Sequence, residues 1–464
     1  MLFCELCVLC VELFFEKQFP ILARHLKSPL VLVYTTSTTP RLRYIFDLML
    51  TDLVGIEFEI THDVDKFIFY NGPKFNYSEK QFGEELFFFS TQFLFEKKIK
   101  QQDLSVLDWQ DTKAFFATHP KYVLPFDPFA ASFYMVSRYE EYLPFTKDKH
   151  ERFDAAQSMA FQKGFLHKPI VNIYAKKIRE ILAEAFPKLT FKEQNYQYIS
   201  TIDIDNAWAF KEKGFLRTSG AFLRSLSRFD FSAVIERLSV ILNKKPDPYY
   251  TYDHLFEIQN KYKISSIYFF LLGDYAENDK NVSGSRKKFQ SLIKQIADYC
   301  EVGIHPSYAS NQDVAKLFLE KKRLEKIVRR DITKSRQHFL KMKLPETYHN
   351  LIEYDITDDY TMGFSGEVGF RAGICSSFYF YDLSRDTPTR LHIHPFAVMD
   401  ATLRFYMKVQ PAEVMSYVGP LIKEVKAVNG TFMSLWHNES ISDIKPWEGW
   451  KEVYEDIVKA AHKN

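Results

Sequence analysis

The chain has 464 residues, of which 46% are hydrophobic and 26% are charged. It is too long for one ordinary domain and too apolar to be disordered, so we expect two domains. There are 61 lysines and arginines against 59 aspartates and glutamates, a net charge of +2. A balance this close to neutral argues against a surface built to bind nucleic acid.

Aromatic residues are unusually frequent, with 44 Phe, 27 Tyr and 5 Trp, whereas glycine occurs only 16 times. Average glycine usage is roughly 7% of a chain. This composition predicts a large core and few long loops.

The N-terminal segment 1–15 is apolar but lacks a basic start and is interrupted by Glu5 and Glu12, so we interpret it as a first helix rather than a signal peptide. Cys4, Cys7 and Cys10 share one face of that helix. They form either a stripe of small residues packed against the core or ligands of a metal or cluster. Five cysteines are too few for a disulfide framework, which indicates a reduced, cytoplasmic protein. The sequence contains no uncharged apolar run of transmembrane length.

The first part of the chain mixes strand-like and helical segments. The expected strands cover 29–36 and 56–60, and the expected helices cover 41–53 and 171–186. Asp127 followed by Pro128 is typical of a helix start and predicts a helix through FAASFYMVSRYEEY. A polar connection follows, and it divides the chain into an N-terminal α/β domain, 1–192, of unassigned role and a second domain, 193–464.

The second part alternates strands with helices, which predicts an α/β fold with a mostly parallel sheet, open or closed into a barrel. The expected strands are 198–204, 264–273 and 302–306, and the expected helices are 215–242, 251–262, 285–300 and 311–330. In such folds the functional residues lie at the carboxyl ends of the strands. We therefore expect a functional site at that edge of the sheet.

Two carboxylates end the first of these strands. Asp203 and Asp205 are two residues apart and so share one face, where like charges are costly unless a cation lies between them. The pair predicts either a divalent metal site or an Asx turn that ends the strand.

Histidines follow at later strand ends. His305 lies at the end of the strand 302–306 and is either a metal ligand or a half-buried histidine. Arg336 and His338 lie two residues apart, on one face of a further strand or in the basic tail of the preceding helix. His437 ends a short apolar strand ahead of a polar loop.

The order of these segments resembles the polysaccharide deacetylase family, of the NodB-homology type. That family removes N- or O-acetyl groups from sugars with a divalent metal on a distorted (β/α) barrel. The resemblance covers 198–460 and is carried by TIDIDNAW, GIHPSYAS, SRQHFL, LHIHPFAVMDATL and FMSLWHN. The segment FDPFAASFYMVSRYEEYLPF is also similar to a domain that accompanies such deacetylases in bacterial proteins.

The resemblance implies roles for individual residues. Asp203 is the general base, and Asp205 and His305 are metal ligands. Where the family has a second histidine this chain has Ala309, so His338 is the candidate third ligand. Two arginines are candidates for orienting the base. The order of the motifs along the chain favours Arg336, whereas the local sequence FRAG favours Arg371.

The fourth and fifth motifs complete the implied site. Asp400 is the acidic residue of the fourth motif and steers His437, the general acid of the fifth. The implied reaction is hydrolysis of an acetyl group, most simply N-acetyl, on a sugar or saccharide precursor, with zinc, or alternatively nickel or cobalt, as the metal. A minority of the Tyr and Phe residues between 360 and 406 are candidates for stacking on the sugar.

Two other functions are compatible with parts of this pattern. A glycosidase would use paired carboxylates without metal, but its acids usually come from different strands. A non-catalytic carbohydrate-binding or scaffolding protein on a decayed deacetylase fold would explain the missing second histidine. The sequence does not indicate the oligomeric state.

Overall fold

The computed structural model describes residues 30–227 and 229–462. The predicted first helix and Cys4, Cys7 and Cys10 lie outside these residues. Two cysteines that are described, Cys300 and Cys375, are free thiols. Within the described ranges, no helix is both long enough and apolar enough to cross a bilayer.

A four-stranded parallel sheet forms the first part of the fold, in the strand order β2-β1-β3-β4. Its strands are β1 (Val31–Tyr34), β2 (Phe58–Thr61), β3 (Lys74–Ser78) and β4 (Leu86–Phe89). Between β1 and β2 run α2 (Pro40–Phe46) and the π-helix η1 (Asp47–Val54). The Thr39 side chain accepts a hydrogen bond from the Leu42 amide and so caps α2. The two strands and the helix expected here are confirmed within a few residues.

Helix α4 (Pro128–Val136) begins as predicted, because Asp127 accepts hydrogen bonds from the Phe129 and Ala130 amides. It ends six residues before the predicted end at Tyr142. The cause is Arg138, which has a left-handed φ of 53° and turns its buried guanidinium toward Glu140 and Glu141. The following helix α6 (Ile170–Ala185) matches the expectation within one residue.

The second sheet has nine strands in the order β12-β13-β11-β10-β9-β8-β7-β15-β14. They are β7 (Gln197–Ile204), β8 (Ser265–Phe270), β9 (Glu301–Ile304), β10 (Lys334–Ser335), β11 (Asp358–Asp359), β12 (Phe378–Asp382), β13 (Thr387–Ile393), β14 (Val398–Met399) and β15 (Thr431–His437). All pairings are parallel except that of β12 with β13.

This second part is a mixed α/β fold whose sheet is open. In the described residues β12 and β14 stand at the two ends of the strand order and do not pair with each other. The expected closed barrel is therefore corrected to an open, mostly parallel sheet, in which the β12–β13 hairpin occupies one edge.

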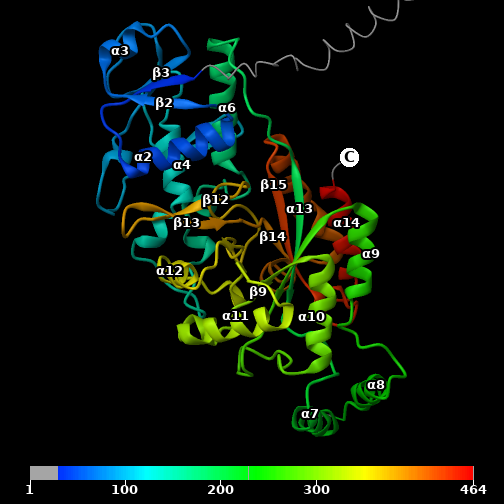
Figure 1. The fold of residues 1–464 in the computed structure, drawn as a ribbon. Helices are drawn as coiled ribbons and strands as arrows, with labels where there is room; N and C mark the ends of the chain where they lie inside the picture. The colour runs from blue at the N-terminus through cyan, green and yellow to red at the C-terminus, as the bar shows by residue number, and fades with distance from the viewer. Residues whose placement is uncertain (1–29, 228, 463–464) are drawn as a thin grey trace, which may run out of the picture.

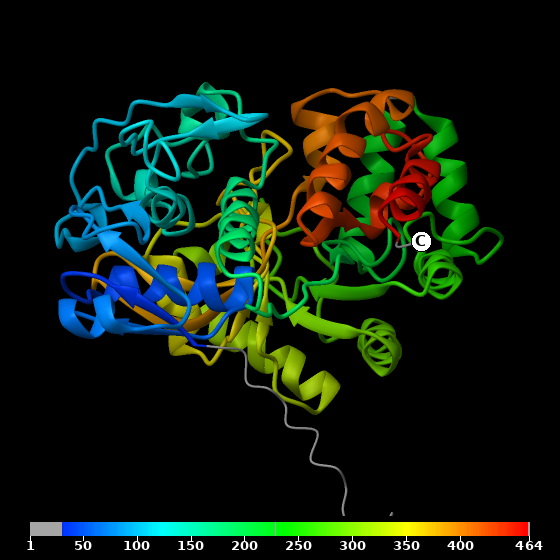
Figure 2. The same ribbon diagram turned by 90° about the horizontal axis from the view of Figure 1, so that it is seen from above.

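Helices cover this sheet, as Figures 1 and 2 show. They are α9 (Tyr252–Tyr262), α10 (Lys287–Tyr299), α11 (Val314–Val328), α12 (Glu346–Glu353), α13 (Val414–Ala427) and α14 (Trp450–Ala461). The single helix expected over 215–242 is two helices, α7 (Phe215–Ser227) and α8 (Phe231–Ile241), which Figure 1 shows away from the main body.

The two sheets belong to parts that contact each other closely. The Tyr44 hydroxyl donates to the Tyr379 carbonyl at 2.6 Å, and Arg41 pairs with Asp386 at 2.7 Å. One cluster of buried hydrophobic residues runs from the first sheet into the second. The residues expected to form the domain boundary, 187–197, connect α6 to β7.

Candidate active site

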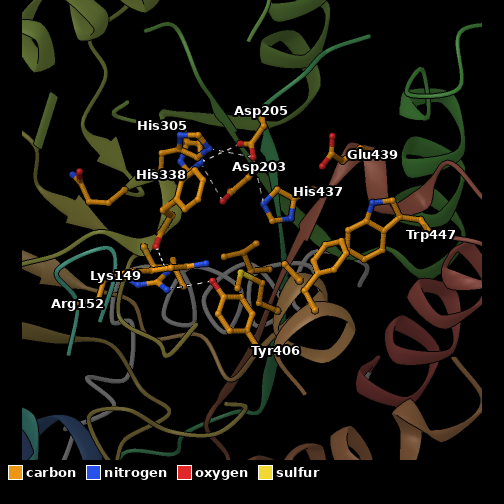
Figure 3. A pocket seen from close by; sticks show the side chains of 17 residues that line it. Lys149, Arg152, Asp203, Asp205, His305, His338, Tyr406, His437, Glu439 and Trp447 are labelled. Carbon is orange, nitrogen blue, oxygen red and sulfur yellow. Dashed lines mark hydrogen bonds and ion pairs between the residues drawn. The ribbon is translucent and has the colours of Figure 1, made fainter. Parts of the chain in front are cut away.

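A cavity of about 450 Å³ lies at the carboxyl ends of the parallel strands (Figure 3). Asp203 reaches it from β7, Asp205 and His305 from the residues just after β7 and β9, His338 from the turn after β10, and His437 from the end of β15. Carboxyl ends of neighbouring parallel strands meet at one edge of a sheet, which explains how residues 234 positions apart become neighbours.

Asp205, His305 and His338 converge on one point. The Asp205 Oδ1 atom lies 3.3 Å from His305 Nε2, and its Oδ2 atom lies 3.4 Å from His338 Nε2. One possible ligand atom from each residue falls within 4.8 Å of the others. Two imidazole nitrogens and a carboxylate oxygen are the ligand types of a catalytic zinc site with one open position.

Both histidine rings are held by their other nitrogen. His305 Nδ1 lies 2.5 Å from the Arg336 carbonyl, to which it donates, and His338 Nδ1 lies 2.9 Å from Asp279 Oδ1. These bonds place the proton on Nδ1 and turn Nε2 toward Asp205. His305 Nε2 and Asp205 Oδ1 are buried with no hydrogen-bond partner among the described residues. A divalent metal ion fits this donor set, because it would satisfy both atoms.

Asp279 was not anticipated from the sequence. It comes from the loop after β8, accepts hydrogen bonds from the Tyr308 and Ala309 amides, and is almost fully buried. Burial raises its carboxyl pKa, but the bond to His338, the charge of His338 and the bonds from the Tyr308 and Ala309 amides together lower the pKa overall. Asp279 thus supports His338 and places Ala309 beside the site.

We expect Asp279→Ala to weaken metal binding about 10- to 100-fold, because the carboxylate fixes the tautomer and orientation of His338. Competitive titration with a chelating dye measures the affinity. Asp279→Asn serves as the matched variant, since it keeps the size of the side chain. Unchanged affinity in both variants would mean that His338 does not depend on this hydrogen bond.

Arg336 is the arginine that contacts Asp203. Its Nη1 atom donates to Asp203 Oδ1 at 3.0 Å and to the Thr201 hydroxyl at 2.7 Å, and the guanidinium is fully buried. The guanidinium carbon also lies 4.7 Å from the centre of the Phe269 ring. These contacts hold Asp203 in one orientation.

Arg371 lies in a different network. Its Nη2 and Nε atoms donate to Glu141 at 2.6 and 2.9 Å, and its Nη1 atom donates to the Gly363 carbonyl. Arg138 also pairs with Glu141. Arg371 therefore does not contact Asp203. Of the two candidate arginines, the geometry favours Arg336 as the one that orients Asp203.

His437 and Asp400 form a hydrogen-bonded pair next to Asp205. His437 Nδ1 lies 2.9 Å from Asp400 Oδ1, the His437 amide donates to Asp400 Oδ2, and His437 Nε2 lies 3.8 Å from Asp205 Oδ2. Burial lowers the pKa of His437, but the charge of Asp400, the hydrogen bond to it and the charges of Asp205 and Asp203 together hold the pKa well above its usual value. The imidazole is thus a protonated donor that points into the cavity.

Other residues line the same cavity. Glu439 lies beside His437, and burial, followed by the Asp205 charge, raises its pKa to about 7. Lys149 and Arg152 come from the first part of the chain, and the Arg152 Nη1 atom donates to the Phe339 carbonyl. Three aromatic side chains, Phe405, Tyr406 and Trp447, form another wall. Of the candidate stacking residues between 360 and 406, the cavity includes only Phe405 and Tyr406.

A second group of possible metal ligands lies on the same sheet. Asp358, His392 and His394 each place one ligand atom within 4.8 Å of the others. His394 Nε2 already lies 2.8 Å from Asp358 Oδ1, so an ordinary hydrogen bond accounts for that contact. Metal measurements must therefore compare variants of each group.

A family model described only as a family of unknown function, DUF7033, matches residues 31–187. No curated protein matches the chain. Solved structures similar to the chain include a protein from Mycobacterium smegmatis assigned as a polysaccharide deacetylase, with 13% identity and a TM-score of 0.37, covering 58% of this chain and 85% of that one.

Two further similar structures come from bacilli. A polysaccharide deacetylase from Bacillus cereus has 11% identity and a TM-score of 0.28 and covers 58% of this chain and 87% of its own. A CE4 family pseudoenzyme from Bacillus anthracis has 12% identity and a TM-score of 0.28, with 58% and 63% coverage.

Proposed function

We propose that this protein is a metal-dependent hydrolase that removes acetyl groups, in the first place N-acetyl, from a sugar or saccharide precursor. The observation that supports this proposal is the convergence of three pairs or groups in one cavity. These are Asp205 with His305 and His338, Asp203 with Arg336, and His437 with Asp400. They match the ligand, base and acid roles that amide hydrolysis needs.

Asp205, His305 and His338 would hold a divalent ion, with zinc as the first candidate and nickel or cobalt as alternatives. When bound, such an ion polarises the substrate carbonyl and lowers the pKa of water to about 7. The three residues fit a divalent ion because two of their buried polar atoms, Asp205 Oδ1 and His305 Nε2, otherwise have no hydrogen-bond partner in the part of the chain that the structure describes.

The chain's own residues supply the proton transfers. Asp203, held by Arg336 and Thr201, accepts a proton from the attacking water. His437, kept protonated by Asp400, donates from Nε2 to the leaving nitrogen. Asp203 and His437 are register partners on the neighbouring strands β7 and β15 and line the same cavity as Asp205, so one proton can be removed while another is delivered.

The cavity wall suits a saccharide. Aromatic rings such as Trp447 and Tyr406 present flat apolar faces beside the polar groups, an arrangement that fits a ring with C–H bonds on one face and hydroxyls at its edge. In this proposal residues 193–464 supply the chemistry. The N-terminal part contributes Lys149 and Arg152 to the substrate side of the cavity.

The test is release of acetate from N-acetylated saccharides by the full chain after loading with zinc, nickel or cobalt. We expect Asp203→Asn to retain the metal but to lower kcat by about 10²- to 10⁴-fold, because it removes the base and leaves Asp205 in place. Metal content and kcat are measured on the same samples.

A matched variant on the same strand, Ser200→Ala, removes a buried hydroxyl that bonds to Tyr454 outside the cavity and should keep its turnover. If the loaded wild-type chain releases no acetate from any such saccharide, the proposed activity is wrong. Tight metal binding without turnover would instead favour the non-catalytic alternative.

A further inference from the structure

Helices α7 and α8 form a hairpin that extends away from the rest of the molecule. Figure 1 shows both helices below the main body, and each makes its main contacts with the other. Long connections join the hairpin to the end of β7 and the start of α9. A two-helix unit with so little support from the core needs another surface to cover its apolar side chains.

The apolar side chains of α8 form an exposed stripe. Phe231, Ile235, Leu238 and Leu242 follow one another at intervals of four, three and four residues, so they share one helix face. Their exposed fractions are 58%, 64%, 43% and 61%. A helix that packs on its own protein core buries such a stripe, whereas here it faces outward.

Exposed apolar side chains also occur in the turn and on α7. Phe229 in the turn is 80% exposed, and Leu223 on α7 is 68% exposed. The residues of the whole apolar patch are Leu223, Leu226, Phe229, Phe231, Ile235, Leu238, Ile241 and Leu242. We call this set the hairpin patch.

The sequence of the hairpin is rich in basic residues. The segment 215–245 contains six basic residues, Arg217, Arg224, Arg228, Arg237, Lys244 and Lys245, and only two acidic ones, Asp230 and Glu236. Lys244 and Lys245 are exposed just beyond α8. The hairpin therefore combines an apolar face with an excess of positive charge.

The positive charge extends into the adjoining cavity, of about 630 Å³, which Arg217 of α7 helps to line. Its basic lining residues are Lys213, Arg217, Arg286, Lys294, Arg323 and Lys326. Its two acidic residues are already paired, Glu212 with Lys288 and Asp274 with Arg323. The side of the molecule that carries the hairpin therefore attracts anions.

We infer that the hairpin patch docks onto the surface of a lipid bilayer that contains anionic lipids. The apolar stripe enters the boundary between headgroups and acyl chains, and the lysines after α8 contact lipid phosphates. A second copy of this chain is a poorer partner, because pairing two hairpins would bring two basic segments together. The inference does not depend on the proposed hydrolase activity, since it concerns a surface outside the candidate active site.

The test is co-sedimentation of the full chain with vesicles of phosphatidylcholine alone or with 30% phosphatidylglycerol. We expect the wild type to bind the anionic vesicles and to bind more weakly at high salt. Ile235→Asp should lower the bound fraction at least about tenfold, because it places a charge within the apolar stripe. Lys244→Glu with Lys245→Glu should weaken binding to anionic vesicles by about tenfold or more.

Phe69→Asp is the matched control, since Phe69 is 77% exposed on the short helix α3 (Val64–Phe69), far from the hairpin in sequence. It should bind vesicles as the wild type does. Because the hairpin variants keep residues 1–29, any binding by that segment would remain in them. Thermal unfolding checks that each variant folds, and Leu242→Asp, just past the end of α8, tests the same stripe if Ile235→Asp does not fold.

The inference is wrong if the wild type does not bind anionic vesicles, or if the folded hairpin variants bind them as well as the wild type does. It is also wrong if the chain is a dimer in solution that Ile235→Asp converts to a monomer while vesicles fail to compete. That last result would assign the patch to a second copy.

Discussion

His338→Ala is expected to weaken metal binding by well over 100-fold and to abolish acetate release. The substitution leaves Asp205 and His305 as ligands, and a two-ligand site cannot complete the three-ligand set that a catalytic zinc ion uses. It also leaves Asp279 without its histidine partner in a buried position. Outer-sphere substitutions alone cost 10- to 100-fold, so loss of a direct ligand should exceed that range.

The measurement is metal content after dialysis against a competing chelator, with affinity from titration of the metal-free protein. His119→Ala is the matched control, because His119 is exposed and outside the cavity. His394→Ala reports on the second group of possible ligands. If His338→Ala binds metal as tightly as the wild type while His394→Ala does not, the metal site is the second group and the assignment of His338 is wrong.

Arg371→Ala is expected to lower the free energy of unfolding by about 3 kcal/mol at neutral pH. The substitution removes two hydrogen bonds from the buried Glu141 carboxylate and leaves Arg138 as its remaining cationic partner. Breaking a buried ion pair by removing one partner typically costs about 3–5 kcal/mol. The value lies at the lower end because Arg138 still compensates part of the charge.

The loss should depend on pH in a defined direction. Burial raises the pKa of Glu141, but Arg371 and Arg138 outweigh it and lower the pKa. The stabilisation from a lowered carboxyl pKa is present above the unfolded value, about 4.3, and disappears as the pH falls through the folded value. Urea unfolding of wild type and variant should therefore differ most near pH 7 and converge in acid.

An exposed ion pair gives the matched control. Arg43 pairs with Asp47 at 2.9 Å with both side chains about half exposed, so Arg43→Ala should cost less than about 1 kcal/mol. If Arg371→Ala leaves stability intact but lowers turnover in the metal-loaded protein, then Arg371 serves the active site and the preference for Arg336 is mistaken.

Much of the fold was accessible from the sequence because its signals are local. The apolar run of β7 and the Asp127–Pro128 start of α4 fall where hydrophobicity and capping predict them. The early end of α4 was not accessible, because it depends on Arg138 reaching a buried partner. Closure of the barrel was mispredicted, since pairing between the first and last strands is a long-range property that no local pattern encodes.

The sequence by itself determined which residues stand at strand ends. From that it follows that Asp203, Asp205, His305 and His437 share one edge of the sheet, because parallel strands present their carboxyl ends together. The tertiary structure alone decided that His338 rather than a residue at position 309 faces Asp205, and that Arg336 rather than Arg371 holds Asp203. It also brought in Asp279 and Arg152, from a loop and from the other part of the chain. These choices depend on distances of a few ångströms between segments far apart in sequence, which only the packing of the whole chain sets.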